Sequence, residues 1–246
     1  MKIGLFIPCY IDQLYPQAAM ATLCLLEKLG AEVVYPLRQT CCGQPMANAG
    51  FEHLTEESSA LFVENFTGFD YIVAPSGSCV LHLRDHLHAS RYPDEAKALR
   101  GKLYELVEFL TDVLQVTSLQ ARFPHRVGLH QGCHGQRGLG LAQMSELAAP
   151  AFSKPEQLLS MVEGLELTGL TRRDECCGFG GTFCVAEEAV SVKMGKDRVT
   201  DHLQHAAEVI TGSDMSCLMH LEGILRRQKS SVRVMHIAEI LNAIEK

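Results

Sequence analysis

The chain has 246 residues, of which 47% are hydrophobic and 21% are charged, a balance typical of a folded protein with a buried core. Its formal net charge is -7 and no run of lysine or arginine occurs, which argues against nucleic acid as the partner because phosphate binding needs a concentrated positive face. No apolar stretch approaches the roughly 20 residues that cross a bilayer, and the apolar run at residues 3–7 is too short for a signal peptide. We therefore expect a cytoplasmic protein.

Strands and helices are predicted to alternate along the first half of the chain. Leu99, Leu103 and Leu106 have the spacing of one helix face and predict a long amphipathic helix, and Gly30 is expected to end an earlier helix. The strands are predicted at residues 2–7, 32–35 and 71–74, and the helices at 17–29, 55–66 and 95–114.

The same order is predicted to recur in the second half. Strands are expected at 127–130 and 208–211, and a last strand and helix within 232–244. The helical regions are predicted at residues 142–165, 187–203 and 218–227. Alternation of this kind indicates an α/β fold in which helices flank mainly parallel sheets, and such sheets form their sites in the loops at the carboxyl ends of the strands.

Ten cysteines are the most informative feature of the composition, because in a reducing compartment many cysteines indicate a metal site or a redox function. Eight of them follow one pattern twice, which marks an internal repeat. The repeated sets are Cys9, Cys41, Cys42 and Cys79, followed by Cys133, Cys176, Cys177 and Cys217. We therefore predict two similar halves, residues 1–120 and 121–246, related by an approximate two-fold axis, with the cysteine loops converging near their interface.

Adjacent cysteines favour a cluster of several metal atoms over a single ion. Neighbouring thiolates are strained when both bind one tetrahedral ion, which usually takes ligands from more widely spaced cysteines. A multi-iron cluster offers separate metal atoms, and four cysteines in each half match the four ligands of one cluster. Gly43 and Gly178 follow the two pairs and are expected to allow positive φ and to point their amides at sulfur. Structural zinc and a thiol–disulfide redox centre are the alternative interpretations.

This doubled pattern resembles the cysteine-rich CCG family, which includes the cysteine-rich subunit of heterodisulfide reductase and the iron–sulfur subunit of glycolate oxidase. Residues 176–183 (CCGFGGTF) and 215–220 (MSCLMH) are most similar to its L-lactate-utilisation branch, and the resemblance covers nearly the whole chain. It implies one or two iron–sulfur clusters of the [4Fe-4S] type held by the eight cysteines, and electron transfer in a complex that oxidises L-lactate to pyruvate. The implied partners are a ferredoxin-like iron–sulfur subunit and a third subunit.

Two positions depart from the fullest family pattern. Ser76 and Asp214 stand where each terminal Cys-x-x-Cys has its first cysteine, and each is either an oxygen ligand or a hydrogen-bonding neighbour of the site. The related heterodisulfide reductase protein has five cysteines in each half, and holds non-cubane clusters with them. Four cysteines in each half of this chain favour ordinary four-iron clusters, and a cluster in only one half is the further alternative.

The remaining candidates are weaker. Cys24 is expected in a helix core, and Cys184 has no counterpart in the first half, so neither is predicted as a ligand. The residues around Cys133 either pack near its loop, or they tune the second cluster or bind an anionic carboxylate substrate. They are His130, His134 and Arg137. Solvated helix faces are expected for the other paired histidines, namely His82, His86, His88, His202 and His205.

Overall fold

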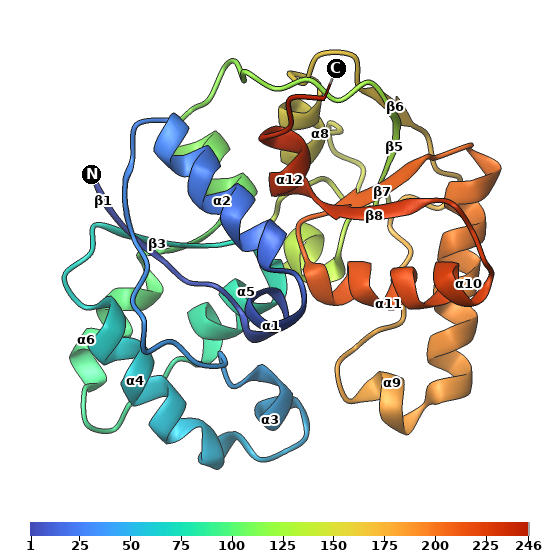
Figure 1. The fold of residues 1–246 in the computed structure, drawn as a ribbon. Coiled ribbons are helices and arrows are strands. Elements are labelled where there is room, and N and C mark those ends of the chain that lie inside the picture. Colours follow the sequence, from blue (N-terminus) through green and yellow to red (C-terminus); the bar gives the residue numbers. More distant parts are fainter. Residues whose placement is uncertain (246) are drawn as a thin grey trace.

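The computed structural model describes residues 1–245 and contains two four-stranded sheets whose strands are all parallel (Figure 1). The strand order is β2-β1-β3-β4 in the first sheet and β6-β5-β7-β8 in the second. The registers correspond as well, because Leu5 of β1 pairs with Val73 of β3 and Leu129 of β5 pairs with Thr211 of β7. The predicted α/β fold with two similar halves is therefore confirmed.

The first half surrounds its sheet with helices on both faces. Its central strands are apolar on both sides, as in other covered parallel sheets, and Ile3, Ile72 and Val73 are fully buried. The elements are β1 (Lys2–Leu5), α1 (Cys9–Leu14), α2 (Pro16–Lys28), β2 (Glu32–Val34), α3 (Gln44–Asn48), η1 (Glu52–Thr55), α4 (Glu56–Phe66), β3 (Tyr71–Ala74), α5 (Gly77–His86), α6 (Pro93–Arg100), β4 (Leu103–Glu105), α7 (Leu106–Glu108) and η2 (Phe109–Val113).

The second half repeats the arrangement around its own sheet. Its central strands are also apolar, and they include the fully buried residues Val127, Val209 and Ile210. The elements are β5 (Arg126–Leu129), η3 (His134–Gly138), α8 (Lys154–Leu159), β6 (Glu166–Thr168), α9 (Phe183–Ala186), α10 (Glu188–Gln204), β7 (Val209–Gly212), α11 (Met215–Arg227), β8 (Arg233–His236) and α12 (Ile237–Leu241).

The long helix predicted at 95–114 is wrong, because the structure divides this segment into α6, the short strand β4, and the helices α7 and η2. Helix α6 ends at Arg100, and Gly101 follows it as the C-cap. Leu103 and Leu106 are fully buried, but the first lies in a strand and the second at the start of the next helix. Burial on both faces of a parallel sheet produced an apolar spacing that matched a helix.

The helical region predicted at 142–165 is also mostly wrong. Only Lys154–Leu159 forms a helix, and the preceding segment pairs at Ala142 and Ser153 in an isolated antiparallel bridge. Ser153 fixes the start of α8, because its hydroxyl accepts a hydrogen bond from the N–H of Glu156, 3.3 Å away. The segment after the helix supplies a strand, β6, that was not predicted.

Helix α2 matches its prediction in extent. Gly30 has φ +84° just beyond the helix, so its expected role at the end of α2 is confirmed. The most deeply buried side chains of the helix are Ala18, Thr22, Leu25 and Leu26, and Ala19 and Leu23 are partly buried beside the core. Within residues 1–245, every helix is too short or too polar to cross a bilayer.

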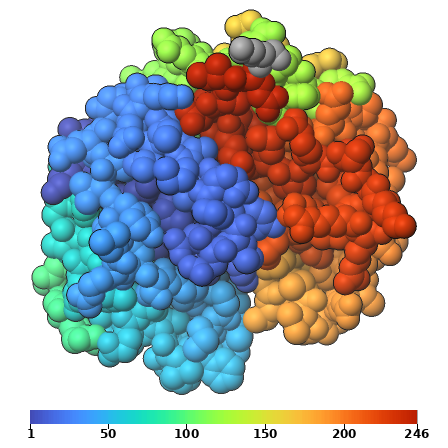
Figure 2. All heavy atoms as spheres, viewed as in Figure 1, coloured from blue at the N-terminus to red at the C-terminus, as the bar shows by residue number. Residues whose placement is uncertain are grey.

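One hydrophobic cluster spans the two halves, and helices of one half pack against helices of the other across the interface. A continuous cluster of buried side chains runs from Ile3 in the first half to Leu241 in the second. Helix α12, from the second half, packs against α2 of the first (Figure 1). Helix α7, from the first half, packs against α8 of the second. Figure 2 shows the blue first half in direct contact with the red and orange second half. This reciprocal packing fixes how the carboxyl ends of the two sheets face each other.

Candidate metal centre

All eight cysteines of the repeated pattern line one cavity of about 270 Å³ between the two halves. Residues from both halves line it, among them Asn48 of α3 and Gly181, which lies in the segment before α9. These two residues face each other across the halves, because the side-chain nitrogen of Asn48 would lie 4.0 Å from a Cβ atom added to Gly181. The predicted convergence of the cysteine loops is therefore what the fold produces, although binding of metal by these cysteines remains a prediction.

In the first half, three loops bring four thiols together at the carboxyl end of the sheet. Cys9 is the first residue of α1, Cys41 and Cys42 lie between β2 and α3, and Cys79 lies in the first turn of α5. The Sγ atoms of Cys9 and Cys41 are 3.9 Å apart, and those of Cys42 and Cys79 are 3.3 Å apart.

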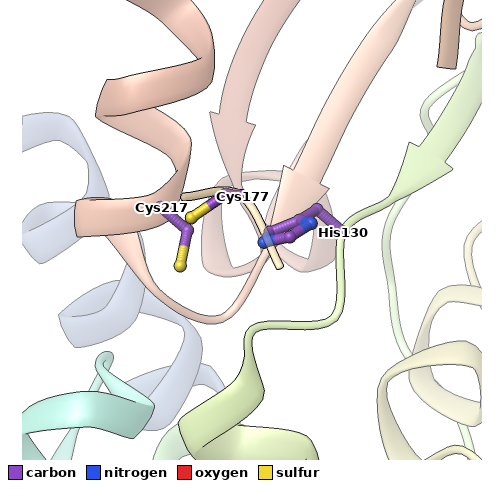
Figure 3. Close-up of side chains that lie close together, drawn as sticks. All are labelled: His130, Cys177 and Cys217. Atoms are coloured by element: carbon purple, nitrogen blue, oxygen red, sulfur yellow. The ribbon is translucent and has the colours of Figure 1, made fainter. Parts of the chain in front are cut away.

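In the second half, the corresponding loops place Cys133, Cys176, Cys177 and Cys217 in the same cavity. Cys133 precedes η3, the pair lies between β6 and α9, and Cys217 lies in the first turn of α11. A side-chain nitrogen of His130 and the Sγ atoms of Cys177 and Cys217 all lie within 4.8 Å of one another (Figure 3). Thiols and imidazoles at such separations are a donor set suited to a metal.

Gly43 and Gly178 have the conformation that the sequence predicted. Their φ angles are +89° and +86°, a region that side chains other than glycine rarely adopt. Each amide donates a hydrogen bond to the sulfur of the first cysteine in its pair, Cys41 or Cys176, at 3.4 Å in both cases. In each half, the left-handed turn at glycine therefore directs a backbone N–H group at the sulfur of the first cysteine of the pair.

The thiols of each half differ in acidity. Hydrogen bonds donated by the thiols of Cys42 and Cys9 hold the pKa of Cys41 well below its ordinary value, and the same bonds raise the pKa of Cys42 and Cys9. In the second half, the pKa of Cys176 is lowered in the same way, chiefly by the thiol of Cys133. The first cysteine of each pair is therefore the first to reach the thiolate form that binds metals.

Ser76 and Asp214 are the N-cap residues of α5 and α11. The Ser76 hydroxyl accepts from the N–H of Cys79 at 3.4 Å, and Asp214 Oδ1 accepts from the N–H of Ser216 at 3.2 Å. Asp214 also joins the halves, because its Oδ2 accepts from the N–H of Ser78 at 2.7 Å, beside an isolated bridge between Ser76 and Asp214. Both residues line the cavity, and their contacts place them as supports of the cysteine loops.

Aromatic side chains from the two halves meet at the cavity. The rings of Tyr10 and Phe179 are 6.1 Å apart in an edge-to-face contact, and both residues line the cavity. Burial is the main cause that raises the pKa of Tyr10, and the nearby thiols add to it. Sequence reasoning did not single out these residues, although Tyr10 directly follows Cys9 and Phe179 directly follows a Cys-Cys-Gly triplet.

The three polar residues around Cys133 have different surroundings. His130 is buried, and burial lowers the pKa of its side chain to about 3, so the imidazole is neutral. His134 lines the cavity, with its Nδ1 3.8 Å from the Sγ of Cys133. Arg137 instead forms an ion pair with Glu146 at the surface. His130 and His134 are thus the two histidines of this group that approach the thiols.

The two cysteines and two of the histidines outside the repeated pattern can be compared with what the sequence predicted for them. Cys24 is partly buried in α2, and Cys184 donates from its thiol to the carbonyl of Gly181 at 3.0 Å; among the described residues, neither belongs to the cavity lining. The solvated face expected for His82 and His202 is wrong, because their exposed fractions are 8% and 0%. His202 occupies space left by Gly128, where an added Cβ would come within 2.3 Å of the imidazole.

His86 and His88 are exposed, as expected, and the ring of His86 stacks on that of His82 with centroids 5.2 Å apart. His205 is half-buried, and its Nδ1 lies 3.3 Å from a carboxylate oxygen of Asp201.

Two copies of one α/β unit that direct eight thiols into a shared cavity define a duplicated cysteine-rich protein. The chain belongs to the CCG family: the family model described as "Cysteine-rich domain" matches residues 3–84 and 127–222. These two ranges each contain one complete set of four cysteines. The clustered cysteines of this family are a donor set suited to metal.

Similar proteins extend along the whole chain. It is 42% identical to "Lactate utilization protein A" of an Exiguobacterium species over 98% of this chain and 97% of the relative. It is 39% identical to the protein of that name from Bacillus subtilis, over 99% and 100%, and 40% identical to that from Geobacillus thermodenitrificans, over 98% and 99%. The chain therefore lies in the branch of the family that the sequence resemblance indicated.

One solved structure has the same fold. A hypothetical protein from Helicobacter pylori superposes with a TM-score of 0.63 at 12% identity, over 100% of this chain and 49% of that longer chain. This chain thus corresponds to about half of the solved protein. At this level of identity the likeness concerns the fold alone.

Proposed function

We propose that the eight cysteines hold two iron–sulfur clusters, one in each half, and that the protein transfers electrons in the oxidation of L-lactate to pyruvate. The observation that carries this proposal is the lining of one cavity by both complete sets of thiols. The assignment to lactate follows the relatives, which are called "Lactate utilization protein A". Iron–sulfur clusters supply the ability to accept and release single electrons, with a potential set by the surrounding protein.

The donor set of each half fits a four-iron cluster. Four thiols approach from three loops, which is the number of cysteines that a [4Fe-4S] cluster uses. The adjacent cysteines at 41–42 and 176–177 suit separate metal atoms better than one. The amides of Gly43 and Gly178 already point at sulfur, and such hydrogen bonds stabilise charge on a cluster. These features favour clusters over isolated reactive thiols.

Several further parts of the proposal follow from the family. We place the boundary between the two cysteine-rich units between residues 120 and 121. The partners that we propose are a ferredoxin-like iron–sulfur subunit, which would exchange electrons with the clusters, and a third subunit of a lactate-oxidising complex. We place the protein in the cytoplasm, because all ten cysteines are free thiols and a reducing compartment keeps thiols in that form.

Anaerobic purification with assays for iron, acid-labile sulfide and zinc tests the proposal. Iron with matching sulfide is the expected result. Cys42→Ser and Cys177→Ser should each remove about half of the iron, whereas Cys184→Ser, the matched control outside the cavity lining, should retain all of it. A variant of either cavity cysteine that loses no iron contradicts the two-cluster arrangement. Lactate oxidation with the partner subunits then tests the substrate, and normal growth on lactate without this protein contradicts it.

A zinc-stabilised module is the second candidate, and one observation favours it. His130, Cys177 and Cys217 place their donor atoms within 4.8 Å of one another, and zinc commonly binds such sets of cysteine and histidine. The metal assays separate the two functions, because zinc without iron or sulfide supports the structural module. The absence of all three would leave a thiol–disulfide function based on Cys41–Cys42 or Cys176–Cys177.

A further inference from the structure

His130 marks a chemical difference between the two otherwise similar halves. Its N–H donates to the carbonyl of Thr211 at 2.7 Å, just as the N–H of Phe6 donates to that of Val73 at 2.9 Å. His130 and Phe6 therefore occupy equivalent positions, directly after β5 and β1. Both are buried, with exposed fractions of 2% and 0%. The first half thus has an apolar ring at this position, and the second half has an imidazole.

Phe6 has a packing role that explains its presence. Its ring makes edge-to-face contacts with Phe62 and Phe66, with centroids 5.2 and 5.8 Å away. Contacts of this kind stabilise a buried aromatic cluster beyond the area that they bury. For His130, in contrast, packing leaves a polar requirement unmet: among residues 1–245, neither Nδ1 nor Nε2 of its ring has a hydrogen-bond partner.

A buried polar group without a partner destabilises a protein by about 1–3 kcal/mol. One nitrogen of His130 lies within 4.8 Å of the Sγ atoms of both Cys177 and Cys217, and Figure 3 shows the ring beside these two cysteines at the end of β5. A neutral imidazole nitrogen and two thiolates all bind metals through lone pairs. A metal atom at this place would therefore satisfy the nitrogen that the protein alone leaves unpartnered.

We propose that His130 is a nitrogen ligand of the metal centre in the second half, whereas the centre in the first half is bound by thiolates alone. This inference rests on the proposed function, because it requires metal at the second set of cysteines. Ligand identity is one of the properties that set the potential of an iron–sulfur centre, so a histidine added to the cysteines of the second half would change it. The two centres would therefore differ in potential although their folds correspond.

Nitrogen coupling in the electron paramagnetic resonance spectrum tests the assignment. The full chain, reconstituted anaerobically with iron and sulfide and then reduced, should show strong coupling to a ¹⁴N nucleus. Growth with ¹⁵N-labelled histidine should replace that coupling by the ¹⁵N pattern in the unsubstituted protein. His130→Phe, which copies Phe6 of the first half, should abolish the coupling and leave the signal from the first centre. His53→Asn, a control at an exposed histidine, should retain it.

Two outcomes would overturn the inference. The first is full iron and sulfide content without histidine-derived coupling. The second is coupling that persists in His130→Phe, and its removal by His134→Asn would then assign it to His134. The labelled unsubstituted protein decides the first outcome even if His130→Phe does not fold. Absence of iron and sulfide from the unsubstituted chain is a different result, because it contradicts the proposed function itself.

Discussion

Replacement of Gly178 by alanine should destabilise the protein far more than the same change at a glycine with an equal φ but free space. Gly178 has φ +86°, and a left-handed conformation costs a side-chain-bearing residue about 1–2 kcal/mol. An added Cβ would also lie 2.7 Å from the backbone oxygen of Ser191 and 2.7 Å from the Cβ of Met194. Helix α10 would have to move, and forced repacking of this kind costs about 1–3 kcal/mol. The expected loss is therefore about 2–5 kcal/mol.

Gly50 is the matched control. Its φ is +84°, and among the residues that the structure describes no heavy atom lies within 4 Å of its added Cβ. Gly50→Ala should therefore lose only about 1–2 kcal/mol, the cost of the backbone conformation. Urea denaturation of the metal-free chain under reducing conditions measures both free energies of unfolding. If Gly178→Ala is within about 0.5 kcal/mol of Gly50→Ala, a margin typical of surface changes, the steric reasoning is refuted.

Two further predictions concern the buried carboxyl groups of Asp214 and Glu105. Asp214→Ala should lower the free energy of unfolding by about 2–4 kcal/mol, because the N–H groups of Ser78 and Ser216 both lose their buried acceptor. Ser76→Ala, which removes one cap bond, should lower it by only about 0.5–1 kcal/mol. Equal losses for the two variants in urea denaturation would contradict this reasoning. Burial raises the pKa of Glu105 to about 8, above its ordinary 4.5, so its contribution to stability is present below pH 4.5 and is lost as the pH rises to about 8. Melting temperatures from pH 5 to 9 should therefore fall less in Glu105→Gln than in the unsubstituted protein, and parallel curves would count against this pKa.

The placement of the cysteines could be predicted from the sequence because it depends on local rules. In a parallel sheet, the residues that follow the strands meet at one edge, so Cys9 and Cys133 could be assigned to the site from strand patterns alone. The repetition of Cys-Cys-Gly then indicated that the second edge resembles the first. Positive φ at Gly43 and Gly178 followed from the same local reasoning.

Features that depend on contacts between distant segments could not be predicted in this way. Strand β4 was missed because Leu103 and Leu106 are both buried, and sequence spacing does not tell whether a sheet or a helix buries them. The burial of His202 depends on the missing side chain of Gly128, which lies far earlier in the chain. The approach of His130 to Cys177 and Cys217 likewise arises only when three separate loops meet.

The contacts between helices of the two halves have a consequence for the proposed electron transfer. Helix α12 packs against α2 and α7 packs against α8, so helices as well as loops hold the two halves together. Tertiary packing therefore helps to set the gap between the two sulfur-lined walls. Electron tunnelling is steeply sensitive to distance, so under the proposed function this packing would hold the two centres at a constant tunnelling distance.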